Sequence, residues 1–412
     1  MATRVRVDPG LVEHYTLGLA KHGAYGETGV WRPVYSPAWV AAQDQVAAWC
    51  EEAGLRVWRD AVGSVWGRLE SANRGKAIAS GSHVDSQRPG GRYDGALGVV
   101  AALTAVRTLN EQFGTPKRPL EVVSFCEEEA SRFPTTNFWG SRAVTGGIAP
   151  GEPDTIRAFE GETIAAAMRE VGLDPARIPE AARDDIETFI ELHIEQGPLL
   201  EQAGLPVGIV NAITGVRHYY LDVVGRTDHA GAVPMDLRRD PMAAAVEIAF
   251  RAMEKALATG RPAVTTVGRM LVEPNYPVMV PEKVMFTVWT GHPDPAGLAS
   301  LFAHHEALFR ELGARRNVDI AWRVGVDKPP CPCDPELVRL LEELSDALGL
   351  QAPTMHSGAA HDSQVMAKRC KVAMIFVQSK GGRSHTPEEF TSIEHAVAGI
   401  ELLAAALHRL AY

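Results

Sequence analysis

Gly81-Ser82-His83-Val84-Asp85-Ser86 follows closely on an apolar run, Ala77-Ile78-Ala79, that predicts a buried strand. The strand gives way to a glycine-rich loop that ends at Asp94, and catalytic groups often lie at such strand ends. Imidazole and carboxylate are ligands for zinc and its first-row neighbours. Asp85 is placed to orient the His83 ring, as carboxylates behind metal-bound histidines do. Taken alone, the stretch fits equally a capped turn around a hydrogen-bonded histidine.

Further candidate ligands follow along the chain. Val122-Val123-Ser124-Phe125-Cys126 predicts a second buried strand, and Glu127-Glu128-Glu129 come directly after it. Adjacent carboxylates repel one another and are costly to bury without a cation, although a solvated acidic loop is the alternative. His193 and His385 stand in two more loops, beside glycines and carboxylates. Together the four segments predict a metal site.

Composition excludes several classes of protein. The chain has 412 residues, enough for two domains, and its 46% hydrophobic content supports a substantial core. A net charge of −10 disfavours nucleic-acid binding, which usually needs a basic face. No apolar run is long enough to cross a membrane, the N-terminus has no apolar signal-peptide region, and five cysteines do not make a disulfide framework. We therefore expect a reduced, cytoplasmic protein with no membrane partner.

The order of predicted elements indicates a domain interrupted by another. Strand-like and helix-like stretches alternate up to residue 126, which is typical of an α/β architecture. From about residue 213 the pattern becomes βαββαβ, the order of a ferredoxin-like layer, with elements predicted at 219–224, 240–258, 263–272, 283–290, 296–312 and 317–326. We therefore predict one domain from 1–212 with 327–412, and a second from 213–326.

The motifs occur in an order that resembles a known family. They are His-x-Asp at 83–85, Asp94, the glutamates, His-Ile-Glu-Gln-Gly at 193–197, Asp-His-Ala-Gly at 228–231, Ser-Gly-Ala-Ala-His-Asp at 357–362 and Ser-His-Thr-Pro-Glu-Glu at 384–389. This series resembles the metal-dependent amidohydrolases of the M20 peptidase clan, over about residues 10 to 410. The most similar branch is that of hydantoinases and carbamoylases, with N-carbamoyl-L-amino acid hydrolases, β-ureidopropionases and allantoate amidohydrolases.

The resemblance implies a fold and an activity. The fold is a large α/β metallopeptidase-like catalytic domain, interrupted by a small ferredoxin-like α+β domain that serves as lid and dimerisation unit. The activity is hydrolysis of a non-peptide C–N bond (amide, carbamoyl or ureido) in a small molecule. The implied assembly is a homodimer through residues 213–326.

The resemblance also fixes the register of the glutamates. Members of the family read Glu-Glu-Gly-x-Arg-Phe here, and Arg132-Phe133 align Glu128 and Glu129 with that pattern. Glu128 then matches the general base, which takes a proton from water and passes it to the leaving nitrogen. Glu129 matches a metal ligand, and Glu127 stays outside the site.

Two divalent metal ions per subunit are implied, held by His83, Asp94, Glu129, His193 and His385. His83 and His193 share one ion, Glu129 and His385 the other, and Asp94 bridges the two. Paired ions of this kind clamp the attacking and carbonyl oxygens of a substrate. Histidine and carboxylate ligands suit zinc, manganese, cobalt and nickel alike.

Other matches concern the substrate. His229 resembles the histidine that a partner subunit's small domain directs at the substrate carbonyl, although a solvent-facing histidine in a tight turn is the alternative. Gln196 resembles the residue that contacts the carbamoyl group. His361 and Asp362 match a loop of the pocket wall, where a structural hydrogen bond is an equal alternative.

Two departures from the branch affect the substrate tail. Members of the branch have the motif Pro-Asn-x-x-Asn-x-Ile-Pro, followed by the motif Asp-x-Arg-His-Pro. The corresponding segments of this chain are residues 274–281 and 289–293, and they depart from these motifs. Val278 thus replaces the asparagine that faces the substrate, and Gly291 the arginine that binds its α-carboxylate. Loss of such a buried charge-assisted contact costs roughly 2–5 kcal/mol. We expect a substrate whose tail is more apolar or differently charged.

Two residues could contact the substrate tail in place of the missing asparagine and arginine. Trp289 would offer an aromatic surface, unless it is a core-facing tryptophan of the strand. Arg383, beside His385, would offer a cation, unless it is an ordinary surface arginine.

Two other functions are weighed against the amidohydrolase. An aminoacylase or dipeptidase of the wider clan is disfavoured, because the motifs at 193–197 and 228–231 mark the carbamoylase branch. A non-catalytic scaffold would be free to lose ligands, yet all matching ligands and the base are present.

Overall fold

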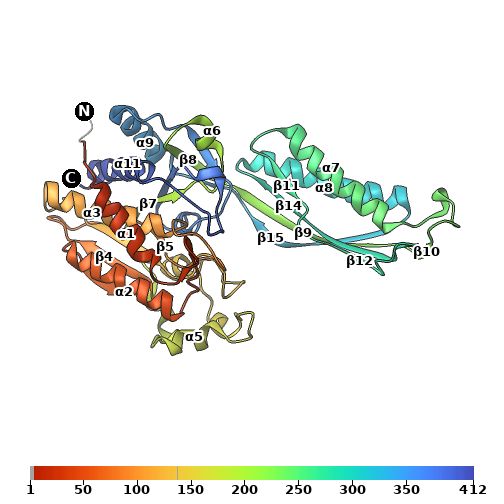
Figure 1. The fold of residues 1–412 in the computed structure, drawn as a ribbon, viewed down its shortest axis with the longest axis horizontal. Coiled ribbons are helices and arrows are strands. Elements are labelled where there is room, and N and C mark those ends of the chain that lie inside the picture. The colour runs from red at the N-terminus through yellow and green to blue at the C-terminus, as the bar shows by residue number, and fades with distance from the viewer. Residues whose placement is uncertain (1–3, 137) are drawn as a thin grey trace. The chain divides into compact units, whose positions relative to one another are not determined.

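The computed structural model describes residues 4–136 and 138–412, which form two compact units (Figure 1). The large unit contains the chain up to Asn211, Cys333–Met355 and Ala359–Tyr412. The small unit contains Ala212–Pro332 and His356–Gly358. The small unit is therefore an insertion in the sequence of the large one.

A mixed sheet forms the centre of the large unit, with the strand order β8-β18-β7-β5-β6-β4-β3. The strands are β3 (Arg56–Arg59), β4 (Val65–Leu69), β5 (Ala77–His83), β6 (Leu120–Phe125), β7 (Ile186–Ile194), β8 (Val207–Ile213) and β18 (Lys371–Val377). The central four, β18, β7, β5 and β6, are parallel, so their carboxyl ends share one edge of the sheet. The run at 77–79 lies in β5, as predicted, and the run at 122–126 lies in β6 except for Cys126, which comes directly after the strand.

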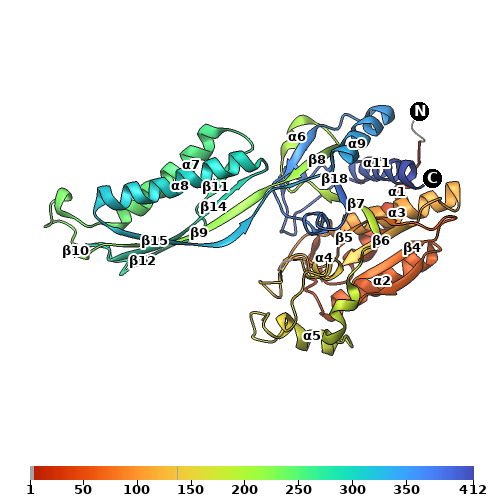
Figure 2. The ribbon, with the colours of Figure 1, turned by 180° about the vertical axis from the view of Figure 1, so that it is seen from behind.

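The helices of the large unit are α1 (Pro9–Ala20), α2 (Pro37–Glu52), α3 (Ala96–Phe113), α4 (Trp139–Val144), α5 (Ile164–Glu170), α6 (Leu199–Ala203), α9 (Pro335–Leu348), α10 (Asp362–Met366) and α11 (Ile393–Ala411). Helix α3 packs against β5 and β7 and also against α1 and α11 (Figure 2). Its long apolar run is buried nearly all round for that reason. Short strands β1 (Ala24–Tyr25) and β2 (Gly29–Val30) pair with each other, whereas β16 (Cys331–Pro332) and β17 (Thr354–Ser357) pair with β8.

The small unit has an antiparallel sheet of order β11-β14-β9-β15, to which β12 adds by pairing with β14. Its elements are β9 (Gly215–Val224), β10 (Asp228–His229), α7 (Pro241–Thr259), β11 (Val264–Thr266), β12 (Met270–Glu273), β13 (Met279–Val280), β14 (Lys283–His292), α8 (Pro295–Arg316) and β15 (Asp319–Lys328). Both long helices pack on one face of this sheet (Figure 1). The predicted ferredoxin-like order is confirmed.

One predicted strand of the small unit is wrong in its extent. The run 263–272 is divided into β11 and β12 by a break at 267–269. Within the break the carbonyl of Arg269 still accepts a hydrogen bond from the N–H of Thr287. Gly268 stands in the middle of the break, and glycine in a strand pattern commonly marks such an irregularity.

The structure also describes the cysteines and the hydropathy of the helices. All five cysteines are free thiols. Among the described residues, no helix combines the length and the hydropathy needed to cross a membrane.

Candidate active site

The ends of the parallel strands bring the predicted ligands together. His83 is the last residue of β5, and His193 lies one residue before the end of β7. Glu128 and Glu129 follow β6, Asp94 lies in the loop between β5 and α3, and His385 lies in the loop after β18. Since these strands are neighbours and parallel, their following loops meet at one edge of the sheet.

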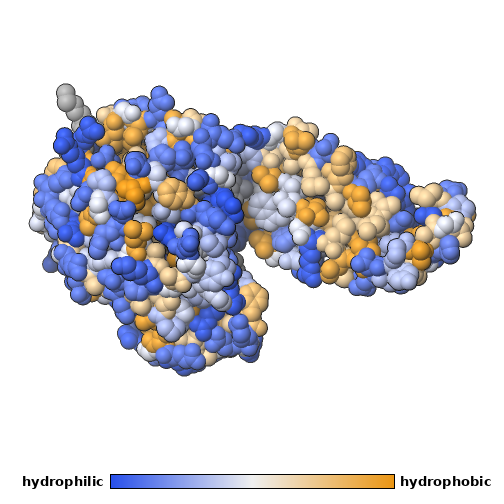
Figure 3. All heavy atoms as spheres, viewed as in Figure 1, coloured by the Kyte–Doolittle hydropathy of each residue, from blue (hydrophilic) through white to orange (hydrophobic). Residues whose placement is uncertain are grey.

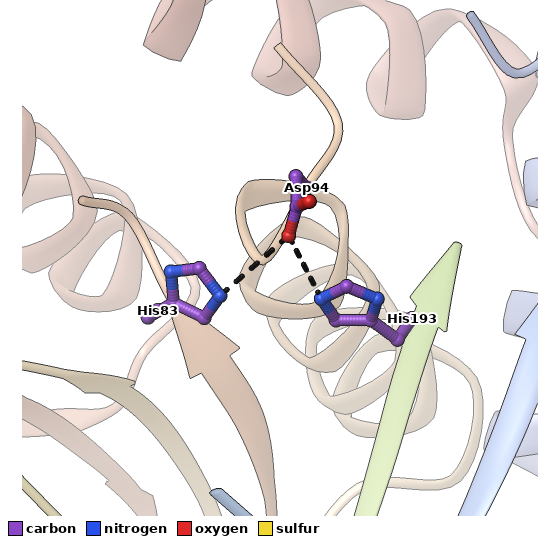
Figure 4. Close-up of side chains that lie close together, drawn as sticks. All are labelled: His83, Asp94 and His193. Atoms are coloured by element: carbon purple, nitrogen blue, oxygen red, sulfur yellow. Dashed lines mark ion pairs between the residues drawn. The ribbon is translucent and has the colours of Figure 1, made fainter. Parts of the chain in front are cut away.

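One group of candidate metal ligands is formed by His83, Asp94 and His193 (Figure 4). Oδ1 of Asp94 lies 3.2 Å from Nε2 of His193 and 3.8 Å from Nε2 of His83. Nδ1 of His83 faces the carbonyl of Asp85 at 3.1 Å, and Nδ1 of His193 faces that of Ile194 at 3.0 Å. A proton on each Nδ1 satisfies these carbonyls and leaves both Nε2 atoms as acceptors, and Nε2 of His193 accepts a hydrogen bond from the N–H of Gly95 at 3.1 Å.

A second group is formed by Asp94, Glu129 and His385. Nε2 of His385 lies 3.5 Å from Oδ2 of Asp94 and 3.4 Å from Oε2 of Glu129. The two oxygens of Asp94 therefore serve different groups. The His385 side chain is 50% exposed, so this group lies at the mouth of the site.

The geometry of both groups suits divalent metal binding. Ligand atoms around a tetrahedral zinc ion, each about 2.0–2.1 Å from it, lie about 3.3 Å from one another. Contacts of 3.2 to 3.8 Å between the donor atoms agree with that spacing. The donors are also of the appropriate kind, since all are imidazole nitrogens or carboxylate oxygens.

The three glutamates after β6 point in different directions. Glu127 has a positive φ of 50° and is fully buried, with Oε1 accepting hydrogen bonds from the N–H of Phe133 and the hydroxyl of Thr136. It therefore faces away from both groups. Glu128 places Oε2 3.5 Å from Nε2 of His83, and Glu129 reaches His385.

Asp85 connects the loop after β5 with the glutamates. Its carboxylate is fully buried and accepts hydrogen bonds from the backbone N–H groups of Glu128 and Glu129 at 3.1 and 3.0 Å. Oδ1 also lies 3.5 Å from Nδ1 of His83. Behind it, the buried guanidinium of Arg32 donates to the carbonyls of Val84 and Leu19. Burial lowers the pKa of Arg32 to about 10, against the opposing effect of Asp85.

The electrostatics of the cluster favour a bound cation. Burial raises the pKa of Glu128 and of Glu129 well above the usual value, and each carboxylate is raised further by acidic neighbours. Burial alone would lower the pKa of His83, but Glu128 and Asp85 outweigh it and raise that pKa. Burial would raise the pKa of Asp94, but His193, His83 and His385 together lower it. The carboxylates thus need positive partners to remain ionised.

Glu389 and Ser384 hold Asp94 in place, and sequence reasoning did not identify them. Oε1 of Glu389 accepts hydrogen bonds from the N–H groups of Tyr93 and Asp94 at 2.8 and 2.9 Å. The hydroxyl of Ser384 donates to Oδ2 of Asp94. A side chain at Gly91 would collide with Glu389, its Cβ meeting Oε1 at 2.2 Å. The sequence signals were the glycine pair at 90–91 and the second glutamate of the 384–389 motif.

A cavity of about 230 Å³ opens over the two groups. It is lined by Gln87, Asp94, Glu128, Glu129, Phe138, His193, Gln196, Ala359, Ala360, His361 and His385. This is smaller than the roughly 300–1,000 Å³ typical of sites for drug-sized ligands. The cavity therefore has room for a small polar group beside the candidate metal ligands.

Gln196 and His361 are both part of that cavity wall. Nε2 of Gln196 donates to Oδ2 of Asp94 at 2.9 Å, whereas its buried Oε1 has no hydrogen bond among the described residues. The His361 ring packs edge-on against His193, with ring centroids 4.6 Å apart. Burial lowers the pKa of His361 well below its usual value, so the imidazole is neutral. Asp362 is buried and accepts a hydrogen bond from Ser141 at 2.6 Å.

The remaining predicted residues lie in the small unit. His229 is exposed at the end of β10, and its Nδ1 accepts hydrogen bonds from the N–H groups of Gly231 and Ala232. Its proton is therefore on Nε2, which makes that nitrogen a donor. Val278 is 56% exposed and accepts through its carbonyl from Ala230, beside His229. Trp289 is half-buried on the face of the sheet without helices.

Arg383 is an ordinary surface arginine, which was the alternative to a role in substrate binding. Its side chain is 55% exposed, and its guanidinium lies 3.2 Å from the carboxylate of Glu388. It is therefore already neutralised at the surface.

Comparisons with known proteins match these observations. The family model of peptidase family M20/M25/M40 matches residues 79–409. Allantoate amidohydrolase from Escherichia coli (strain K12) is 38% identical over 395 residues, covering 96% of each chain. N-carbamoyl-L-amino acid amidohydrolase from Geobacillus stearothermophilus is also 38% identical, covering 95% of this chain and 96% of its own. A solved amidase of the hydantoinase/carbamoylase family from Burkholderia multivorans has a TM-score of 0.92 at 30% identity, with 98% of each chain covered.

Proposed function

Because the chain belongs to peptidase family M20/M25/M40, we propose that its large unit hydrolyses a ureido or carbamoyl C–N bond with the help of two divalent metal ions. The coarser activity follows from the family and its amidohydrolase relatives: the chain is a hydrolase of C–N bonds in small molecules. The residues that line the cavity support the finer assignment of the bond, the ions and the catalytic residues.

The ions would be held by the two groups that share Asp94. His83, His193 and one oxygen of Asp94 would hold the first, and Glu129, His385 and the other oxygen the second. Such ions polarise the carbonyl oxygen and lower the pKa of water. Zinc, manganese, cobalt and nickel all accept this donor set.

Glu128 would act as the general base. Its carboxylate lines the cavity and lies beside His83, which places it near any water that attacks a carbonyl held there. It would accept a proton from that water as the new C–O bond forms, and donate the proton to the leaving nitrogen as the C–N bond breaks. The raised pKa of this buried carboxylate suits a group that must carry the proton between the two events.

The amide oxygen of Gln196 is the observation that favours a carbamoyl group over a simple amide. Oε1 is buried at the cavity wall without a hydrogen bond among the described residues. A buried acceptor left unpaired costs about 1–3 kcal/mol, which a substrate N–H would recover. The terminal NH₂ of a carbamoyl or ureido group supplies such a donor, whereas an acetyl group offers a methyl instead.

The small unit, residues 213–326 in our assignment, would serve as lid and dimerisation domain. Helix α7 exposes Val246, Phe250, Met253 and Leu257, with 52%, 59%, 42% and 76% of their surface accessible. Their spacing puts them on one stripe of the helix, and Figure 3 shows apolar side chains gathered over this part of the unit. A continuous apolar stripe on a helix is typical of a contact surface. We propose that a second copy of the chain covers it, and that His229 then reaches the partner's substrate.

A substrate panel tests the proposed activity. Purified protein is stripped with a chelator, reloaded separately with zinc, manganese, cobalt or nickel, and assayed for ammonia released from ureido and carbamoyl compounds. Parallel assays with N-acetyl amino acids and dipeptides cover the aminoacylase and dipeptidase alternative. We expect turnover of ureido or carbamoyl compounds only, lost on chelation and restored by metal. Turnover confined to N-acetyl amino acids or dipeptides would overturn the proposal, as would activity that survives complete metal removal.

A further inference from the structure

The small unit carries a groove on the face of its sheet that has no helices. Side chains alternate along the strands, so Tyr219, Leu221, Val284 and Phe286 pack into the core under α7 and α8. Their neighbours point to the opposite face. The groove residues, as we call them, are His218, Tyr220, Thr266, Arg269, Thr287 and Trp289, and the cavity they line has a volume of about 480 Å³.

Strand register explains why these residues meet. Trp289 of β14 stands opposite His218 of β9 and Thr266 of β11. In the next row, Tyr220 of β9 stands opposite Thr287 of β14. Side chains that are directly opposite across antiparallel strands lie about 4.5–5.5 Å apart at Cβ and contact one another. The groove is therefore built by two adjacent rows of cross-strand pairs.

Two glycines leave room for two of the aromatic rings of the groove. A Cβ at Gly291 would come within 2.8 Å of the Trp289 indole, and one at Gly325 within 2.3 Å of the Tyr220 ring. The indole thus occupies the space where a side chain at position 291 would begin.

The cations beside the groove have no acidic partners. Arg323 stacks on Tyr220, 4.0 Å from the ring centroid, and Arg269 is exposed at the rim. Within residues 4–136 and 138–412, neither guanidinium forms an ion pair with a carboxylate. Arg217 of the same unit, in contrast, pairs with Glu306 and Asp327. In a protein with net charge −10, two unpaired arginines beside aromatic rings form a local positive site.

We propose that the groove binds a planar organic anion, an aromatic or heteroaromatic carboxylate, which stacks on the Trp289 indole and pairs with Arg269. The site is contained in the small unit, and binding there is independent of the proposed hydrolysis. An aromatic ring matches the flat indole, and a carboxylate matches the unpaired guanidinium.

Calorimetric titration of the full-length protein with three matched probes tests the binding. The probes are 2-naphthoate, which is planar and anionic, 2-naphthamide, which is planar and neutral, and decahydro-2-naphthoate, which is anionic but not planar. We expect 2-naphthoate to bind most tightly, with each of the other two weaker by between about twofold and tenfold. Equal affinity for all three probes, or no heat with 2-naphthoate, would overturn the proposal.

Variants locate the probe. Arg269→Gln should weaken 2-naphthoate binding about tenfold, as loss of a charge-assisted contact does, and leave 2-naphthamide unaffected. Trp289→Leu should weaken both aromatic probes, and Trp289→Phe should retain part of the affinity because it keeps a ring. Arg261→Gln, an exposed arginine of the same unit outside the groove, is the matched control. Binding lost equally in Arg261→Gln and Arg269→Gln would show nonspecific charge attraction and overturn the site.

Assays of naphthoate binding and of ureido hydrolysis separate the groove from the proposed function. Naphthoate binding without any ureido hydrolysis would retain the groove and refute the proposed function. Ureido hydrolysis without naphthoate binding would retain the proposed function and refute the groove as a binding site.

Discussion

Oδ2 of Asp85 accepts a hydrogen bond from the backbone N–H of Glu129 at 3.0 Å. The same carboxylate contacts the N–H of Glu128 and lies 3.5 Å from the His83 ring. One buried aspartate thus fixes the base and a candidate ligand from each of the two groups. Asp85 connects the loop after β5 to the loop after β6, so its replacement should disturb the position of residues in both loops.

Replacement of Asp85 by alanine should lower metal affinity. We expect a loss of about 10–100-fold, the range seen when residues that support metal ligands are removed. Competition with a chromophoric chelator measures it. Asp319→Ala, at an exposed position of the small unit, is the control and should bind metal normally. Unchanged affinity in Asp85→Ala would contradict the supporting role.

The three glutamates should separate by function. Glu128→Gln should reduce kcat by about 10²–10⁴-fold with metal content retained, because an amide cannot accept the proton of water. Glu129→Gln should lose metal instead. Glu127→Gln should keep both, since its carboxylate contacts Phe133 and Thr136 rather than the ligands. Atomic absorption and steady-state kinetics on the three variants decide the matter, and an inactive Glu127→Gln that holds its metal would show that our register is wrong by one residue.

Assembly of the dimer can be tested through α7 and His229. Replacement of Phe250 and Leu257 by glutamate should give monomers in analytical ultracentrifugation, since both are exposed on the proposed contact stripe. Mixing Glu128→Gln chains with His229→Ala chains should then restore part of the activity, because one of the two sites in each heterodimer has both residues. No recovery on mixing would mean that each site is complete within one chain.

Ordinary N-carbamoyl-L-α-amino acids should be poor substrates. Val278 and Gly291 offer no partner for the α-carboxylate, and an unpaired carboxylate in a closed site costs roughly 2–5 kcal/mol. A side chain at position 291 would collide with the Trp289 ring and Thr214. An arginine there therefore fits only if the Trp289 ring is removed or displaced. We therefore expect Val278→Asn with Gly291→Arg to gain little, and the further change Trp289→Asp to raise kcat/KM for these compounds. High kcat/KM in the unmodified protein would refute this account.

Acid should destabilise the small unit through His305. Burial lowers the pKa of this histidine to about 4, and Nε2 lies 3.0 Å from the hydroxyl of Thr290. The folded state therefore keeps the ring neutral, whereas the unfolded chain binds a proton near pH 6.5, so stability falls as pH decreases from 6.5 towards 4. The loss between pH 7.5 and pH 5 should be about 2 kcal/mol.

Urea unfolding of the small unit, followed by hydrogen–deuterium exchange of α8 peptides at both pH values, measures this effect. His305→Gln should remove most of the difference between the two pH values. His14→Gln, at an exposed position of the large unit, should leave it unchanged. An identical pH dependence in His305→Gln and the parent protein would exclude His305 as its source.

Local pattern predicted much of the fold, because strands and helices leave periodic signals. The apolar run before His83 and the run before Glu127 became neighbouring parallel strands, and this is why their following residues meet. The division of 263–272 escaped prediction, since a single glycine does not reveal where a strand leaves its sheet.

Support from distant residues could not be foreseen in the same way. Glu389 holds Asp94 across 295 positions, and Arg32 braces Val84 from 52 positions earlier. Such contacts follow from the folded topology and leave no repeat in the sequence. Family motifs supplied the ligand assignment, whereas the Trp289 groove became visible only when cross-strand register was known.

The contact between Ser384 and Asp94 joins residues 290 positions apart, on either side of the whole inserted unit. Closing so long a loop is inexpensive at equilibrium, since each doubling of loop length adds only about 0.6 kcal/mol. On the ribosome, however, the order of synthesis makes this contact late: the first group of ligands is complete once His193 has emerged, and the second must wait for His385. A nascent chain arrested after the insert would therefore present only the first of the two candidate ligand groups, and the second would be completed by the last segments to leave the ribosome.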